Sequence, residues 1–158
     1  MTETAHALVA GAIAAKFPNP VIAVPLAFTS HFIMDAVPHW DIGTNWRLRA
    51  KNLTGTLAIA ETLIGITVTY FFFAGKVPGL TLALSVAASL LPDWAETPWY
   101  LFFARKDKHG PSQNAGFWEK FTYAVYRTEN FFHRKEQSMF LGILTQVGIV
   151  AFFLFLLQ

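Results

Sequence analysis

Apolar residues gather in five long runs along the chain, and polar residues concentrate between them. The clearest run covers residues 53–74 and is closed by Gly75, Pro78 and Gly79, which are typical of a helix end. The other four runs cover residues 5–16, 21–37, 80–91 and 139–157. A helix crosses a bilayer with about 20 apolar residues, so the runs at 5–16 and 80–91 are short for complete crossings. The pattern predicts an all-α, polytopic membrane protein with about four or five membrane segments.

The stretch between the fourth and fifth runs is polar but keeps a helical period. Phe117, Phe121, Val125 and Phe132 recur at near-helical spacing, with charged residues between them. This pattern predicts an amphipathic helix that lies in the membrane interface. Residues 106–115, rich in Gly, Pro, Ser and Asn, are the expected connection before it. We therefore expect one membrane-embedded helical domain over residues 1–158.

The composition supports a membrane protein and limits its chemistry. Hydrophobic residues make up 54% of the chain and charged residues 14%, whereas soluble domains carry about 25% charged residues. The chain contains no Cys, so a metal site would use imidazole and carboxylate ligands. A net charge of +2 gives no indication of nucleic-acid binding.

The positive charges predict an orientation in the membrane. Of the 12 Lys and Arg residues, all but Lys16 and Lys76 follow the second or the fourth apolar run. These are Arg47, Arg49, Lys51, Arg105, Lys106, Lys108, Lys120, Arg127, Arg134 and Lys135. The positive-inside rule assigns the richer side to the cytoplasm. We expect a multi-pass protein of the inner (plasma) membrane, in contact with membrane lipids.

Residues 30–41 place two histidines and two aspartates at the end of an apolar run. His31 and Asp35 are four residues apart and share one helix face, whereas His39 and Asp41 follow Pro38, where the helix should end. Ionisable groups in apolar surroundings are costly unless they are paired or bind a metal. Metal ligation by His31, Asp35 and His39 is therefore one interpretation, and a simple His–Asp hydrogen bond is the other.

Further ionisable residues are expected at the same end of the bundle. His6 begins the first run, Asp93 and Glu96 follow the fourth, and His133 precedes the fifth. Glu61 should lie about 12 Å deep, level with His31. We predict that His6, Asp93 and His133 complete one or two metal sites, with Glu61 and Asp41 in catalytic or orienting roles.

Several of these residues also have simpler interpretations. Asp41 and Asp93 are suited to cap a following helical turn. Glu61 could hydrogen-bond a neighbouring helix. Glu129 and His133 are four residues apart, where an ordinary ion pair is the simpler role. His109 lies in the Gly- and Pro-rich connection and is expected to be solvated.

Three short motifs give the chain a resemblance to a known family. They are Thr4-Ala5-His6 with Gly11, Leu91-Pro92-Asp93, and His133-Arg134. In these the chain resembles a divergent member of a family of small bacterial membrane-bound, metal-dependent hydrolases, the LexA-binding, inner-membrane-associated hydrolases. The resemblance implies hydrolysis with a divalent metal. The chain departs from the family's Asp-x-Asp-His pattern after Asp93 and has Ser138 where the family has a second His.

Together these features predict a metal-dependent hydrolase, with zinc the expected ion. Its substrate would be an ester or phosphoester at the cytoplasmic membrane face, lipid-derived ones included. The alternative is a non-catalytic membrane protein that binds a metal, another ion or a lipid headgroup. A third possibility is a scaffold with a buried hydrogen-bonded polar cluster. Metal content separates these classes.

Overall fold

The computed structural model describes residues 1–44, 50–105 and 109–157, and within these ranges the chain forms helices and no strand. The elements are α1 (Glu3–Lys16), α2 (Pro20–Asp35), α3 (Lys51–Phe73), α4 (Gly79–Pro98), the π-helix η2 (Trp99–Phe103), α5 (Phe117–Phe132) and α6 (Met139–Leu156). The predicted all-α class is confirmed. Of the basic residues used to predict the orientation, Arg47, Arg49, Lys106 and Lys108 lie outside the described residues.

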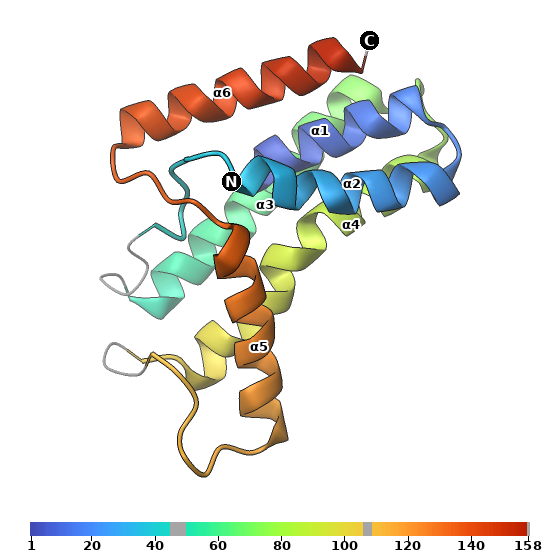
Figure 1. Ribbon diagram of the computed structural model, residues 1–158. Coiled ribbons are helices and arrows are strands. Elements are labelled where there is room, and N and C mark those ends of the chain that lie inside the picture. Colours follow the sequence, from blue (N-terminus) through green and yellow to red (C-terminus); the bar gives the residue numbers. More distant parts are fainter. Residues whose placement is uncertain (45–49, 106–108, 158) are drawn as a thin grey trace.

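Helix α1 occupies the middle of the bundle (Figure 1) and contacts α2, α3, α4 and α6. Its sequence is rich in Ala, and most of its residues are buried. Small side chains permit this enclosure because they let neighbouring backbones come close. At Gly65 of α3, an added Cβ would lie 2.8 Å from the Cα of Thr4. The contact between α1 and α3 therefore depends on glycine at that position.

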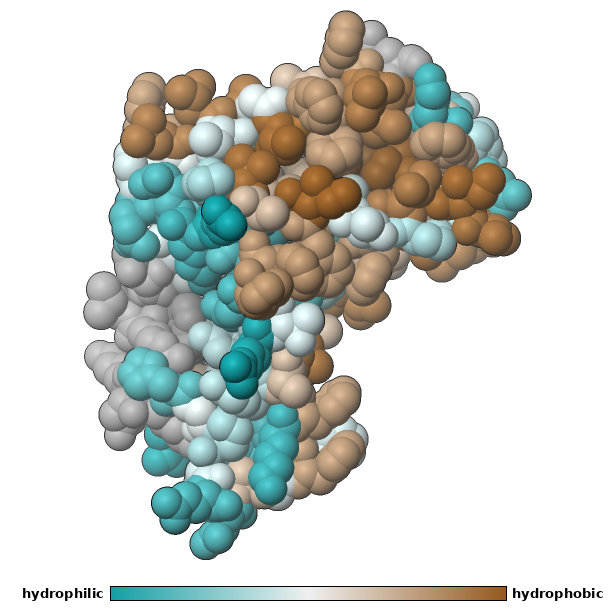
Figure 2. Space-filling model, viewed as in Figure 1, coloured by the Kyte–Doolittle hydropathy of each residue, from teal (hydrophilic) through white to brown (hydrophobic). Residues whose placement is uncertain are grey.

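The helix ends are arranged as the sequence predicted. The Thr81 hydroxyl donates to the Pro18 carbonyl at 2.7 Å, which joins the α1–α2 turn to the start of α4. The opposite helix ends, including the N-terminus of α1 and the C-terminus of α2, meet the connecting segments at the other end of the bundle (Figure 1). Hydrophilic residues gather at that end and along part of the lower region, hydrophobic residues cover most of the upper part of the molecule, and a smaller hydrophilic group lies at its upper right end (Figure 2).

The number of membrane segments is lower than predicted. Among the described residues, α3 and α6 are long and apolar enough to cross a membrane, and α2 is a shorter apolar helix. Helix α1 has 14 residues, so it rises only about 21 Å against a hydrocarbon core of about 30 Å. Only 11% of each apolar window in α3 and α6 is buried within the protein. Their apolar side chains therefore face outward rather than into a core.

The apolar run at residues 80–91 predicted that the fourth helix ends before Pro92. Instead, helix α4 continues to Pro98. An interior proline removes the hydrogen bond to the carbonyl four residues before it, which here is that of Ala88, and α4 continues past this break. In the same turn the imidazole of His31 donates to the carbonyl of Ser89. The continuation carries Asp93 and Glu96 on the same helix as the apolar run.

The predicted amphipathic helix is confirmed as α5. It packs against α4, η2 and α2. Phe117, Trp118, Phe121 and Phe131 remain exposed on it. Its placement in the membrane interface stays a prediction.

We predict that Gly65→Ala destabilises the protein by about 1–3 kcal/mol, because the added methyl overpacks the α1–α3 contact. The matched control is Gly148→Ala in α6, where an added Cβ meets no atom within 4 Å and the better helix propensity of Ala contributes about 0.5–1 kcal/mol. Thermal unfolding in detergent measures both. Equal unfolding temperatures for the two variants would contradict this account of the packing.

Candidate metal centre

The structure brings the predicted site residues together at one end of the bundle. They are His6 from α1, His31 and Asp35 from α2, His39 and Asp41 from the segment after it, Asp93 from α4 and His133 from the end of α5. Among the described residues, three groups have ligand atoms within 4.8 Å of one another: His6, His31 and Asp93; Asp35, His39 and His133; and His31, Asp35 and Glu129. The groups overlap, so they form one continuous cluster.

Asp35 lies at the centre of this cluster and is almost fully buried. Its Oδ1 lies 3.2 Å from His6 Nε2 and 3.7 Å from His39 Nε2. Its Oδ2 lies 3.5 Å from His31 Nε2 and 3.6 Å from His133 Nδ1. The amino group of Met1 also pairs with Oδ1. Each carboxylate oxygen thus faces imidazoles from two different elements.

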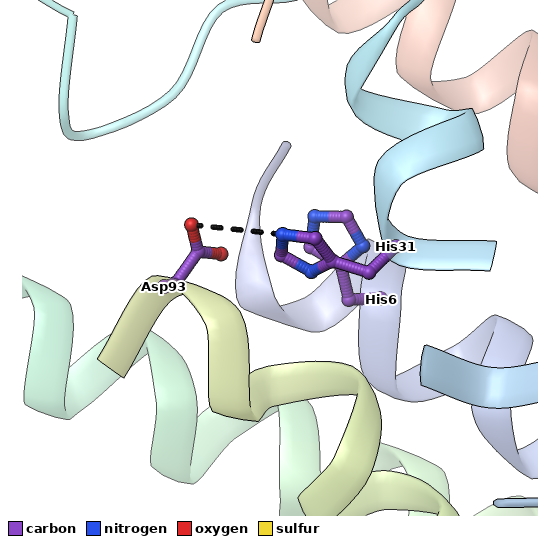
Figure 3. A group of neighbouring side chains, drawn as sticks. All are labelled: His6, His31 and Asp93. Carbon is purple, nitrogen blue, oxygen red and sulfur yellow. Dashed lines mark ion pairs between the residues drawn. The ribbon is translucent and has the colours of Figure 1, made fainter. Parts of the chain in front are cut away.

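His6, His31 and Asp93 form one side of the cluster (Figure 3). The rings of His6 and His31 stack with their centroids 4.1 Å apart, and the carboxylate of Asp93 points toward them from α4. Its Oδ1 lies 3.9 Å from His31 Nε2, and Glu129 Oε2 lies 3.6 Å from the same nitrogen. One imidazole nitrogen is therefore surrounded by carboxylates.

Backbone carbonyls fix the orientation of two imidazoles. His31 Nδ1 lies 2.8 Å from the Ser89 carbonyl and His39 Nδ1 lies 2.7 Å from the Val37 carbonyl. A carbonyl oxygen only accepts hydrogen bonds, so each Nδ1 carries the hydrogen. In the neutral ring Nε2 then presents a lone pair to the cluster. Metal-bound histidines are commonly held in this way.

Several buried polar atoms in the cluster have no hydrogen-bond partner. They are both ring nitrogens of His6, His31 Nε2, Asp35 Oδ2 and Glu129 Oε2. Each such atom costs about 1–3 kcal/mol when it is left unsatisfied. A cation between the imidazoles and carboxylates would satisfy the carboxylate oxygens and one nitrogen of each imidazole. The donor set is imidazole nitrogen and carboxylate oxygen, which suits zinc and similar divalent metals.

His39, Asp41 and His133 form the other side of the cluster. His133 Nε2 lies 2.6 Å from Asp41 Oδ2 and 2.7 Å from His39 Nε2. Asp41 Oδ1 accepts a hydrogen bond from the Thr44 hydroxyl at 3.0 Å. Asp41 therefore both holds its own turn, as a capping residue does, and reaches the cluster.

The electrostatics of this side favour the deprotonated forms. Burial raises the pKa of Asp41, but the contacts with the imidazoles of His133 and His39 outweigh it and hold that pKa well below its usual range. Burial lowers the pKa of His133 to about 4 against the opposing effect of Asp41. At neutral pH the pair is thus a carboxylate and a neutral imidazole, the forms that bind metals.

Backbone pairing joins the two segments that carry these residues. The His39 N–H donates to the Arg134 carbonyl at 3.0 Å, and the Glu136 N–H donates to the His39 carbonyl at 2.7 Å. The Arg134 N–H donates to the Asp35 carbonyl at 2.9 Å. These bonds place His39 against His133. The sequence carried no signal for this pairing, because both segments are short and irregular.

Glu61 holds the N-terminus of α1. Its two carboxylate oxygens accept the backbone N–H groups of Glu3 and Thr4, each at 2.9 Å. This satisfies N–H groups that a helix start leaves unpaired. Because α1 carries His6, Glu61 positions that imidazole through the helix. Its role as general base stays a prediction.

Sequence analysis missed Glu129 and gave Glu96 no role in the site. Glu129 was assigned an ordinary ion pair with His133, but its side chain is buried and its Oε2 lies 3.6 Å from His31. Glu129 lies seven residues, or about two helical turns, after Thr122, and both are buried on α5. This shared helix face was the available signal. Glu96 is buried one turn after Asp93. Because the helix was predicted to end before Pro92, the sequence did not show that Asp93 and Glu96 share one helix.

A cavity of about 250 Å³ adjoins the cluster. Asp41, Asp93 and His133 line it, as do Glu61 and Glu96. A ligand in this cavity would therefore contact candidate metal ligands directly. His109, expected to be solvated, is exposed and lies in the connection before α5.

Comparisons with protein-family models, curated proteins and solved structures find no match for this chain. Membership of the LexA-binding hydrolase family accordingly stays a prediction from the short motifs. The functional argument rests on the geometry of the cluster and its cavity.

We predict that Glu61→Ala frees the N-terminus of α1 without removing a metal ligand. The loss of two acceptors should cost about 1–3 kcal/mol locally, so amide hydrogen exchange at residues 3–6 should accelerate about 5- to 150-fold. The control is Glu119→Ala, which removes a carboxylate that accepts the Ser112 N–H in a different part of the chain. Exchange at residues 3–6 that is equal in both variants would show that Glu61 does not hold the helix.

Proposed function

We propose that this protein is a membrane-embedded, metal-dependent hydrolase that cleaves an ester or phosphoester. The observation that supports this most strongly is the set of buried imidazoles whose Nδ1–H groups are held by carbonyls and whose Nε2 atoms face carboxylates. Burying such a set of polar groups costs free energy unless a cation binds them. The adjoining cavity gives a substrate access to the same residues.

The metal ligands we propose are His31, Asp35 and His39. His6, Asp93 and His133 complete the cluster, and because its two sides share Asp35 it suits one or two ions. The absence of Cys and the mixture of imidazole and carboxylate ligands favour zinc. A bound divalent metal lowers the pKa of its water from 15.7 to about 7 and so supplies hydroxide at neutral pH.

The chain's own residues have two further roles in this proposal. Asp41 contacts His39 and His133 and lines the cavity, so it orients both rings beside the space that a substrate would occupy. Glu61 anchors α1 and so positions His6. It also lines the cavity, which supports the second role proposed for it, that of general base.

We propose that the protein lies in the inner membrane with several helices embedded. The outward-facing apolar side chains of α3 and α6 support embedding, because soluble monomers rarely expose such large apolar areas. Lys16 and Lys76 lie in the turns away from the cluster. The basic residues near the cluster, including Arg134 and Lys135, favour a cytoplasmic position for it.

We predict that the purified protein, with any affinity tag removed, contains at least one divalent metal ion per chain when zinc is supplied during expression. His31→Ala and Asp35→Ala should each lose most of it, because each removes a ligand from a shared cluster. His109→Ala, an exposed histidine outside the cluster, should retain the wild-type content. Elemental analysis by mass spectrometry measures this. A wild-type protein without stoichiometric metal would contradict the hydrolase proposal.

We predict that the metal-loaded protein hydrolyses p-nitrophenyl phosphodiesters, phosphomonoesters or carboxylic esters. Chelation and Asp35→Ala should reduce turnover to the rate without protein, and His109→Ala should leave it unchanged. Release of p-nitrophenol is followed by absorbance. Stoichiometric metal without turnover of any of these compounds would favour the metal-binding alternative over an enzyme.

A further inference from the structure

The cavity beside the metal centre runs along α3. Its α3 wall consists of Lys51, Thr54, Gly55, Ala58, Ile59 and Glu61, which recur at the spacing of one helix face. From Lys51 to Glu61 this wall extends about 15 Å at the helical rise of 1.5 Å per residue. The opposite wall comes from α4 and η2 and includes Trp94, Thr97 and Leu101. The small residues Gly55 and Ala58 leave space between the walls.

The edge of this cavity is apolar and exposed. Ile59 is 52% exposed, Trp94 36% and Leu101 50%, and all three line the cavity. Ile59 belongs to α3, a helix apolar enough to cross a membrane. The cavity therefore opens on the surface that would face lipid chains, as well as reaching the candidate metal ligands Asp93 and His133.

The cavity also presents polar side chains, and two of their buried atoms lack a hydrogen-bond partner among the described residues. Thr54 Oγ1 and Glu96 Oε2 are buried without a hydrogen-bond partner, and Glu96 is 8% exposed. Lys51 and Lys135 also line the cavity. Their ammonium groups donate to the backbone carbonyls of Ala104 and Gly43. The two oxygen acceptors, the two lysine ammonium groups and the apolar edge together match an amphiphile with a charged, hydrogen-bonding headgroup.

We propose that this cavity binds a membrane phospholipid, with its phosphoester beside the metal centre and an acyl chain passing over Ile59, Trp94 and Leu101 into the bilayer. The proposal rests on the proposed function, because it makes the phosphoester the group that is hydrolysed. A headgroup N–H or O–H would satisfy Glu96 and Thr54. The lysines attract the phosphate. Entry from the side, between α3 and α4, would spare the substrate from leaving the bilayer.

Photo-crosslinking tests lipid occupancy independently of activity. The protein is reconstituted in vesicles that contain phosphatidylethanolamine with a diazirine on one acyl chain, and crosslinked peptides are mapped by mass spectrometry. We expect crosslinks concentrated on residues 55–59 and 94–101. Gly55→Leu should reduce them by about tenfold or more, because its side chain would occupy the slot and oppose lipid binding. An added Cβ at Gly55 meets no atom within 4 Å, so the variant should fold.

The matched control is Gly148→Leu on α6, where an added Cβ also meets no atom within 4 Å. It should leave the crosslinks at residues 55–59 unchanged. Crosslinks spread evenly over α3 and α6, or unaffected by Gly55→Leu, would overturn the proposal. Metal content separates the two claims. Stoichiometric metal and hydrolysis of soluble phosphoesters without these crosslinks would reject the lipid site alone, whereas specific crosslinks on a metal-free protein would reject the hydrolase alone.

Discussion

Four imidazoles converge on one buried carboxylate, that of Asp35, and the arrangement of this end of the protein depends on that convergence. A buried charge is tolerated only when it is compensated. The positive charge comes from the Met1 amino group, which pairs with Oδ1. The four imidazoles come from α1, α2, the segment after α2 and the end of α5, so these segments must be held at the same point. Gly65 lets α1 approach α3, and Glu61 fixes the start of α1. The cluster thus explains why a short, Ala-rich helix occupies the middle of the bundle.

The helical class and the meeting of the ionisable residues could be predicted from the sequence. Alternating apolar runs and turns place the ends of alternate helices on the same side, which gathers His6, His39, Asp93 and His133. Spacing alone placed His31 and Asp35 on one face of a helix. These predictions succeeded because they depend on local periodicity and on chain direction, both of which are written in the sequence.

Other features depended on contacts that spacing does not encode. The carbonyls that orient His31 and His39 belong to the backbone, which every residue shares. The continuation of α4 through Pro92 could not be predicted locally, because a proline in a helical pattern more often marks the helix end. The number of membrane segments was overestimated because an apolar, Ala-rich run is also what a helix enclosed by other helices requires. Ser138, where the resembled family has a histidine, accepts a hydrogen bond from the Leu141 N–H at the start of α6.

X-ray absorption spectroscopy of the zinc-loaded protein, with any affinity tag removed, distinguishes a metal centre at Asp35 from a hydrogen-bonded polar cluster. The account predicts a first shell of nitrogen and oxygen at about 2.0–2.2 Å, with the multiple-scattering signature of at least two imidazoles. Asp35→Ala should abolish this spectrum, and His109→Ala should preserve it. A protein that retains no zinc, or a spectrum without imidazole that is indifferent to Asp35, would contradict the account.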